Sequence, residues 1–151
     1  MNSVIERIVE EGQGMAGQGK YVDSEVLGAL STFADSMTAR SAAYEAIQSQ
    51  ETAIIEKACQ SIQGHAEPER LMQEMTLLLR HSALAMLMDD ATVLMEGGLS
   101  WVQAMAEAQQ QKELYVAASE QLMAATLKAL TDEQGSLLQP FLKLIPQTLK
   151  S

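Results

Sequence analysis

The stretch ERLMQEMTLLLRHSALAMLM, residues 69–88, decides the fold of this chain. Its apolar residues recur at intervals of three and four, which indicates a helix. They occupy more than one stripe of that helix, so we expect it to be the central and most buried one. Pro68 stands directly before the stretch and suits the first turn of such a helix, where an amide hydrogen is not needed.

Outward from this helix, glycines and prolines divide the chain into helix-length pieces. Gly weakens a helix interior and Pro ends one, and no stretch shows the alternation and β-branched enrichment of a strand. The sequence predicts an all-α protein with helices over about 2–11, 24–62, 69–88, 91–96, 99–110, 113–130 and 133–149. Their unequal lengths, without a heptad or a repeat, favour globin-like packing over a four-helix bundle.

The composition is that of an acidic globular protein. The 151 residues include ten Lys and Arg against twenty Asp and Glu, for a net charge of -10. Because phosphate backbones and anionic lipids attract positive surfaces, this charge argues against sequence-independent binding to either. The single cysteine, Cys59, excludes an internal disulfide framework and fits a reducing compartment. With no signal peptide and no apolar run long enough to span a membrane, we expect a cytoplasmic protein.

The N-terminus is predicted to form a separate helical arm. Val4, Ile5, Ile8 and Val9 lie on one stripe of a short helix, and a glycine-rich stretch follows at 12–19. A ten-residue helix is not stable alone in water, so its apolar stripe must dock on another surface. We therefore divide the chain into an arm and glycine-rich tether over 1–20 and a globin-like helical domain over 21–151.

Three motifs in and after the central helix resemble the phycobiliproteins, the phycocyanin and allophycocyanin subunits of the phycobilisome. They are the run Met75–Arg80, the run Met88-Asp-Asp-Ala-Thr-Val-Leu94 and the pair Gly98-Leu99. Weaker similarity extends over 19–23, 116–130 and 140–145, and so over nearly the whole chain. The resemblance implies the globin-like phycobiliprotein fold with an N-terminal helical arm, and a place in cyanobacterial photosynthesis.

The departures from the family pattern concern the pigment. Phycobiliproteins join an open-chain tetrapyrrole, the bilin, to a cysteine in the first turn of the central helix, beside an Arg and an Asp. By the resemblance, these three positions fall on Leu71, Gln73 and Glu74. Leu71 has no nucleophile and Gln73 cannot form a charge-assisted pair with a propionate. The loop before the helix is also shorter, so we expect no covalent bilin.

Several other candidates for chemistry have plainer explanations. Cys59 lies at helical spacing with Ile55 and Ile62, which indicates a core residue whose thiol is a poor nucleophile. His81 is a candidate haem ligand by fold analogy, but a surface or interface histidine is the alternative. Together with His65, these residues do not make a tetrahedral zinc set. No nucleophile with its base and no phosphate-cradling loop is present, so we do not expect an enzyme.

Two functional interpretations remain open at this point. The first is a non-enzymatic phycobiliprotein-like subunit without covalent bilin, acting by protein contacts in assembly, structure or regulation of the phycobilisome or a related complex. The second is a sensor or carrier that holds a tetrapyrrole or another apolar molecule non-covalently in the vestigial bilin pocket, with Glu74 as its polar anchor. The residues of that pocket would be Leu71, Gln73, Glu74, Met75, Leu79 and Trp101.

The resemblance also implies a protein partner. In phycobiliproteins the N-terminal arm packs on a second subunit, so we expect a homodimer, or a heterodimer with a phycobiliprotein-like subunit, without nucleic acid or membrane insertion. A partner would also place the protein at the periphery of the thylakoid. The expected interface residues are Val4, Ile5, Ile8, Val9, Tyr21, Phe33, Met37, Arg40 and Tyr44.

Overall fold

The stretch that begins at Pro68 forms helix α3 (Pro68–Met88), the best-buried helix of the chain. The computed structural model describes residues 4–62, 64 and 67–151. Pro68 occupies the first turn of α3, and Asp89 ends the helix with a left-handed backbone, φ 49°. Nine side chains of α3 are buried, among them Leu71, Met75 and Leu79. The prediction of a central helix with more than one apolar stripe is confirmed.

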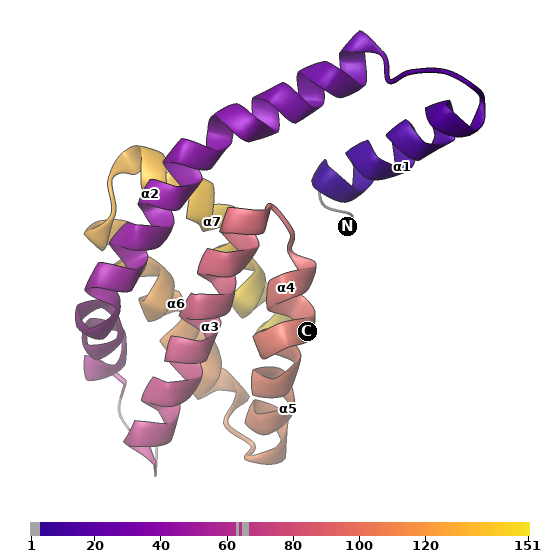
Figure 1. Cartoon of the computed structure of the whole chain (residues 1–151). Helices are drawn as coiled ribbons and strands as arrows, with labels where there is room; N and C mark the ends of the chain where they lie inside the picture. The colour runs from indigo at the N-terminus through magenta and orange to yellow at the C-terminus, as the bar shows by residue number, and fades with distance from the viewer. Residues whose placement is uncertain (1–3, 63, 65–66) are drawn as a thin grey trace.

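Every regular element among the described residues is helical, which confirms the predicted all-α, globin-like architecture. The other elements are α1 (Val4–Gly17), α2 (Ser24–Gln60), α4 (Thr92–Leu94), the π-helical segment η1 (Met95–Leu99), α5 (Ser100–Ala108), α6 (Lys112–Ala129) and α7 (Asp132–Lys150). Helices α3 to α7 and the second half of α2 pack around one core, while α1 and the first half of α2 project from it (Figure 1). In the described part of the chain, no helix has the length and hydropathy to cross a membrane.

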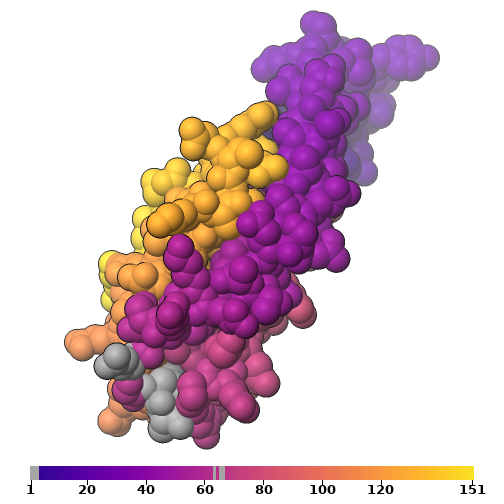
Figure 2. All heavy atoms as spheres, turned by 90° about the vertical axis from the view of Figure 1, so that its left-hand side faces the viewer, coloured from indigo at the N-terminus to yellow at the C-terminus, as the bar shows by residue number. Residues whose placement is uncertain are grey.

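Helix α2 connects the projecting arm to the globular body. The Asp23 carboxylate accepts a hydrogen bond of 2.9 Å from the Val26 amide, so Asp23 caps the helix. The second half of α2 buries Ile47, Ile54 and Ile55, whereas Leu27 and Leu30 in the first half are 53% and 42% exposed. Figure 2 shows α2 crossing the molecule between α6 and α7 on one side and α3 on the other.

Two predicted helix ends are wrong, and both lie at glycines. Helix α1 continues through Gly12 and Gly14 to Gly17 instead of ending at Glu11. Glycine in a helix interior is about 1 kcal/mol less favourable than alanine. Packing of α1 along α2 compensates for this cost. A Cβ at Gly12 would lie 3.3 Å from Val22, so glycine allows this close approach. The tether is therefore shorter than predicted and begins at the turn Gln18-Gly19.

Gly97-Gly98, the second predicted break, joins two helices instead of separating them. These glycines lie in η1, which carries α4 into α5 without an interruption of helical backbone. An added Cβ at Gly97 would lie 2.6 Å from Cδ2 of His81, and one at Gly98 would lie 3.2 Å from Nδ1. The pair is therefore needed for the close approach of η1 to α3 rather than for a turn.

Candidate functional site

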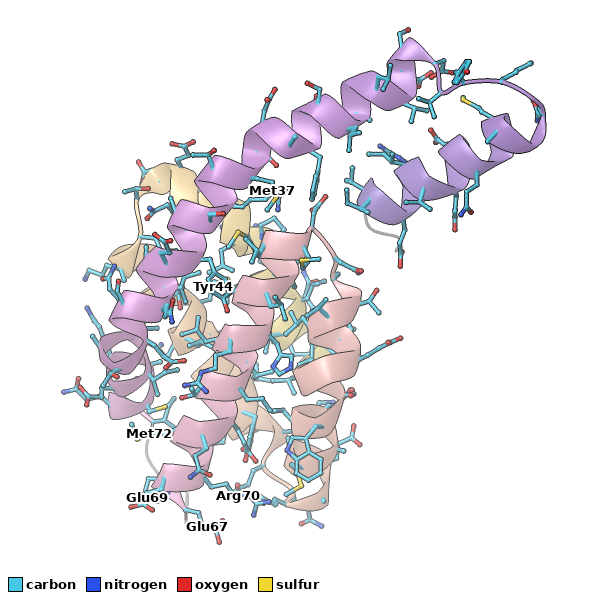
Figure 3. The ribbon with its side chains drawn as sticks, viewed as in Figure 1. Met37, Tyr44, Glu67, Glu69, Arg70 and Met72 are labelled. Atoms are coloured by element: carbon cyan, nitrogen blue, oxygen red, sulfur yellow. The ribbon has the colours of Figure 1, made fainter. Side chains whose placement is uncertain are left out.

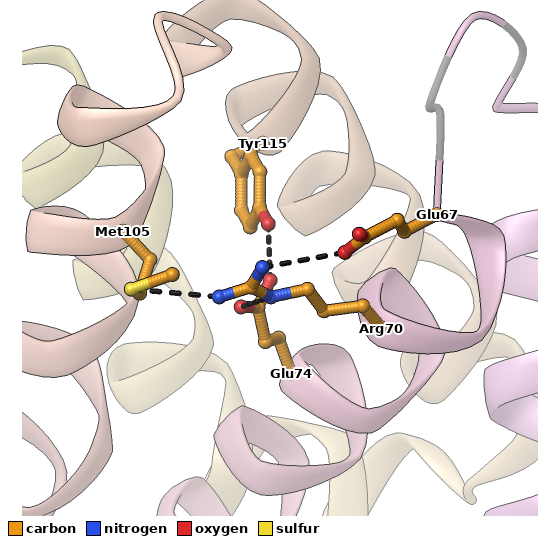
Figure 4. A network of polar contacts seen from close by, with 5 residues as sticks. All are labelled: Glu67, Arg70, Glu74, Met105 and Tyr115. Atoms are coloured by element: carbon orange, nitrogen blue, oxygen red, sulfur yellow. Dashed lines mark hydrogen bonds and ion pairs between the residues drawn. The ribbon is translucent and has the colours of Figure 1, made fainter.

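The most polar part of the interior lies near the N-terminal end of α3. Glu74 is 6% exposed, although a buried carboxylate is costly without partners. The Tyr115 hydroxyl, from α6, donates a hydrogen bond to Oε2 of Glu74. Nε of Arg70 lies 3.4 Å from Oε1 of the same carboxylate (Figure 4). Both oxygens of Glu74 are therefore engaged within the protein.

Arg70 extends this network to the surface and to a third helix. Its Nη1 lies 3.3 Å from a carboxylate oxygen of Glu67, and its Nη2 lies 3.7 Å from the Met105 sulfur in α5. Burial raises the pKa of Tyr115, and the hydrogen bond to the Glu74 carboxylate raises it further, because a tyrosinate would face a negative charge. The tyrosine is thus held protonated as a donor, and the network joins α3, α5 and α6.

The six candidate pocket residues lie in different environments. Leu71 is 2% exposed, and Met75 and Leu79 are fully buried among other core side chains. Trp101 is 55% exposed on α5, so it does not close a pocket over the two buried residues. Gln73 lines the groove described next, while Glu74 belongs to the polar network. Leu71, Met75 and Leu79 thus contribute to the core beside this network.

A groove runs along the seam between α2 and α3. It consists of a cavity of about 530 Å³ and a neighbouring one of about 230 Å³, which share Glu51 and Arg80. Arg80 donates two hydrogen bonds to the Glu51 carboxylate, from Nε to Oε1 at 2.6 Å and from Nη2 to Oε2 at 2.9 Å. The arginine hydrogen bond lowers the pKa of the Glu51 carboxyl. Tyr44 and Met72 mark the seam in Figure 3.

Neither Cys59 nor His81 is arranged for catalysis or metal binding. Cys59 is half-buried on α2 and packs against the core, where burial raises the pKa of its thiol. Nδ1 of His81 lies 2.9 Å from the Leu77 carbonyl oxygen and the ring rests on Gly97-Gly98. In the described part of the chain, no three His, Cys, Asp or Glu side chains converge as metal ligands; His65 lies outside the described residues.

The predicted interface residues fall into an exposed group and a half-buried group. Val9 is 48% exposed and Tyr21 98% exposed. Val4, Ile5 and Ile8 on α1, and Phe33, Met37 and Tyr44 on α2, are half-buried. Tyr44 also lines the smaller cavity of the groove. The stripe of α1 is thus partly covered by its own chain, while side chains such as Val9 and Leu27 stay accessible.

Arg40 makes its contacts within the chain rather than presenting them at the surface. Its side chain is 13% exposed, and one guanidinium nitrogen lies 3.7 Å from the Asp89 carboxylate. A second nitrogen donates to the Met86 carbonyl, and the guanidinium lies 6.0 Å from the Phe33 ring centre. Arg40 thereby ties α2 to the C-terminal end of α3.

Sequence reasoning missed the Tyr115–Glu74 contact and the groove. Arg70 and Glu74 are four residues apart on one helix, so their ion pair was readable from spacing. Tyr115 lies 41 residues from Glu74, and no local pattern marks this pairing. The groove depends on how closely α2 and α3 approach, which is likewise not a local property.

Comparison with known proteins gives one family match that covers most of the chain. The family model described as phycobilisome protein matches residues 14–149. The comparison with curated proteins gives no match.

Proposed function

Because the chain belongs to the phycobilisome protein family, we propose that it is a phycobiliprotein-like subunit without covalent bilin. The family is one of non-enzymatic light-harvesting proteins whose members assemble as oligomers with other subunits. Under this proposal the chain is not an enzyme. It acts through protein contacts in the assembly, structure or regulation of the phycobilisome or a related complex, and its partners hold it at the thylakoid surface.

The observation that carries the proposal is the environment of Leu71. By the family resemblance, this residue stands where the bilin is attached. Its side chain has no nucleophilic atom and is 2% exposed, in contact with the core of the protein. A thioether at this position would require a nucleophilic side chain in place of leucine and displacement of the surrounding core side chains. These residues do not fit a covalently held bilin.

The neighbouring positions support the same interpretation. Glu74, the remaining carboxylate of the family pattern, already accepts a hydrogen bond from Tyr115 and pairs with Arg70. A pyrrole nitrogen would have to compete with both partners. Cys59 is on a different helix, and its raised pKa disfavours the thiolate that thioether formation needs. We therefore propose that the protein works without a bound cofactor.

The arm supports action through protein contacts. Large apolar side chains are exposed on α1, on the turn and on the first half of α2. Grouped exposure of this kind is typical of protein interaction surfaces. The group comprises Val9 at 48%, Tyr21 at 98%, Val22 at 37%, Leu27 at 53% and Leu30 at 42%. We propose that it pairs the chain with a second copy or with a phycobiliprotein-like subunit.

Chromophore loss is tested by co-expression with bilin biosynthesis and bilin lyases, followed by zinc-stained denaturing electrophoresis. A phycocyanin subunit expressed in the same cells is the positive control. The expected result is a fluorescent band for phycocyanin and none at the mass of this chain. A fluorescent band at this mass refutes the proposal.

Dimerisation is tested by light scattering at micromolar concentration, with capture of partners from a cyanobacterial extract. The variant Leu27→Glu, Leu30→Glu is expected to weaken self-association or capture by at least tenfold, and Glu120→Gln is its surface control. A 16 kDa species with no captured partner contradicts the proposal. A bilin or haem titration that gives a bound visible spectrum, lost in Leu71→Trp, establishes the carrier function instead.

A further inference from the structure

The groove between α2 and α3 has an apolar base, and the Arg80–Glu51 ion pair crosses it between its two cavities. Ile55, Met72 and Leu77 supply its apolar surface in the larger cavity, and Ile47 and Ala83 supply it in the smaller one. On α3 the lining residues run from Met72 to Ala83. At 1.5 Å per helical residue, this corresponds to a length of about 16 Å, or three helical turns.

Additional apolar surface continues from the groove along α3. Leu84 is seven residues after Leu77 and four after Arg80, and thus lies on the same side of the helix. It is 39% exposed. The side chains of Thr52 and Gln73 make no hydrogen bond to other described residues and border the groove on its two sides. Apolar side chains therefore line the seam on either side of the Arg80–Glu51 pair.

By helical spacing, three acidic side chains beyond the lining residues flank this groove and form its rim. On α2, Glu45 lies seven residues before Thr52 and Glu56 lies four residues after it. On α3, Glu69 lies four residues before Gln73. All three are exposed and form no ion pair with another described residue. The cation in the lining, Arg80, is neutralised by Glu51. The rim thus carries three uncompensated negative charges on a chain whose net charge is -10.

We propose that this groove binds an amphipathic helix of a partner protein, with an apolar stripe on the groove base and Lys or Arg on both flanks. A helix-in-groove complex needs an apolar surface a few turns long, and the α2–α3 seam supplies one on either side of the exposed Arg80–Glu51 pair. Charge complementarity with the rim selects a basic rather than an acidic partner. This inference rests on the proposed function, action by protein contacts, and assigns it a second surface away from the arm.

The probe is a fluorescein-labelled 14-residue peptide, the sequence Leu-Lys-Lys-Leu-Leu-Lys-Leu written twice, and its counterpart with Glu in place of Lys. Binding to the full chain is followed by fluorescence anisotropy in 50 and 300 mM salt. The Lys peptide is expected to bind with micromolar affinity and to weaken several-fold at high salt, because the rim charges are screened. The Glu peptide is expected not to bind. Equal binding of both peptides overturns the proposal.

Two comparisons, each of a groove variant with a matched control variant, test whether the Lys peptide binds in this groove. Glu45→Gln, Glu56→Gln, Glu69→Gln is expected to weaken the Lys peptide about fivefold or more, at a few tenths of a kcal/mol for each exposed charge. The matched control Glu10→Gln, Glu96→Gln, Glu107→Gln removes the same net charge from exposed positions outside the groove. Equal weakening in both triple variants shows non-specific attraction and overturns the proposal.

The second pair changes the shape of the groove and leaves its charge unchanged. Thr52→Trp fills the groove from an exposed position and is expected to abolish binding, whereas Thr32→Trp on the same helix leaves it unchanged. Binding unaffected by Thr52→Trp overturns the proposal. Light scattering on the same samples separates this result from the proposed function: loss of peptide binding with intact self-association concerns the groove alone.

Discussion

The Tyr115 hydroxyl of α6 donates its hydrogen bond to the buried Glu74 carboxylate of α3, across 41 residues of sequence. Tyr115 is fully buried and Glu74 is 6% exposed. The contact supplies a donor to a carboxylate whose isolation in the interior would be strongly unfavourable. It also uses the one carboxylate that the family pattern would assign to a pigment.

Removing this donor is expected to destabilise the fold. Tyr115→Phe keeps the ring and leaves Oε2 of Glu74 without the hydroxyl, at a cost of about 1–3 kcal/mol in the free energy of unfolding. Urea denaturation followed by circular dichroism measures it. Tyr21→Phe, at a position 98% exposed, is the control and should change nothing. Equal stability of the two variants would show that the contact is dispensable.

The raised pKa of Tyr115 predicts a loss of stability in alkaline solution. Deprotonation costs more in the folded than in the unfolded chain, so the contribution is complete below the ordinary tyrosine pKa of about 10 and falls as pH rises above it. The free energy of unfolding should drop as pH rises above about 10, and less so in Tyr115→Phe. Absorbance at 295 nm should show that this variant lacks the ionisation that Tyr115 contributes above the ordinary tyrosine range.

Substituting alanine at Gly97 is expected to disturb the contact between η1 and α3. The new Cβ would lie 2.6 Å from Cδ2 and 2.9 Å from Nε2 of His81, closer than atoms can pack. Such overpacking costs about 1–3 kcal/mol and outweighs the helix propensity of alanine. Gly14→Ala, where no atom of another group lies within 4 Å, should be neutral or stabilising. In a His81→Ala background most of the cost of Gly97→Ala should disappear; additive effects would disprove the steric cause.

Arg40 is expected to contribute to stability through its contacts at the end of α3. Arg40→Ala removes the donor to the Met86 carbonyl and the partner of Asp89, at a cost of about 1–3 kcal/mol. Thermal and urea unfolding measure the loss, with the exposed Arg7→Ala as the control. If Arg40→Ala weakens dimerisation while stability is unchanged, its main role lies at the interface instead.

Cys59 is expected to react slowly with thiol reagents in the native protein. Burial raises the pKa of its thiol, and the thiolate is the reactive species. Labelling by dithiobis-nitrobenzoate at pH 7.5 should be at least about tenfold slower in buffer than in 6 M urea. A Ser61→Cys thiol in a Cys59→Ser background, at an exposed position, should react rapidly in both. If Cys59 and the engineered Ser61→Cys thiol react at equal rates in buffer, the assignment of Cys59 to the core is contradicted.

The helices themselves were largely predictable, because periodicity and capping are local. The apolar spacing of 69–88 identified α3, and the predicted start at residue 24 is the start of α2. The predictions failed at Gly12–Gly17 and at Gly97-Gly98, where the chain stays helical because α1 packs along α2 and η1 packs closely on His81 of α3. Helix propensity is a preference of about 1 kcal/mol and yields to such contacts.

By itself, the sequence determined the helical class, the acidic charge, the position of the central helix and the absence of a thiol at residue 71. These depend on residue identity and on spacing within one segment. The tertiary structure decided which polar groups meet: Tyr115 with Glu74, Arg40 with Asp89, and Arg80 with Glu51 across the α2–α3 groove. Each pair joins residues 29 to 49 positions apart, and packing of whole helices, not local sequence, sets such distances.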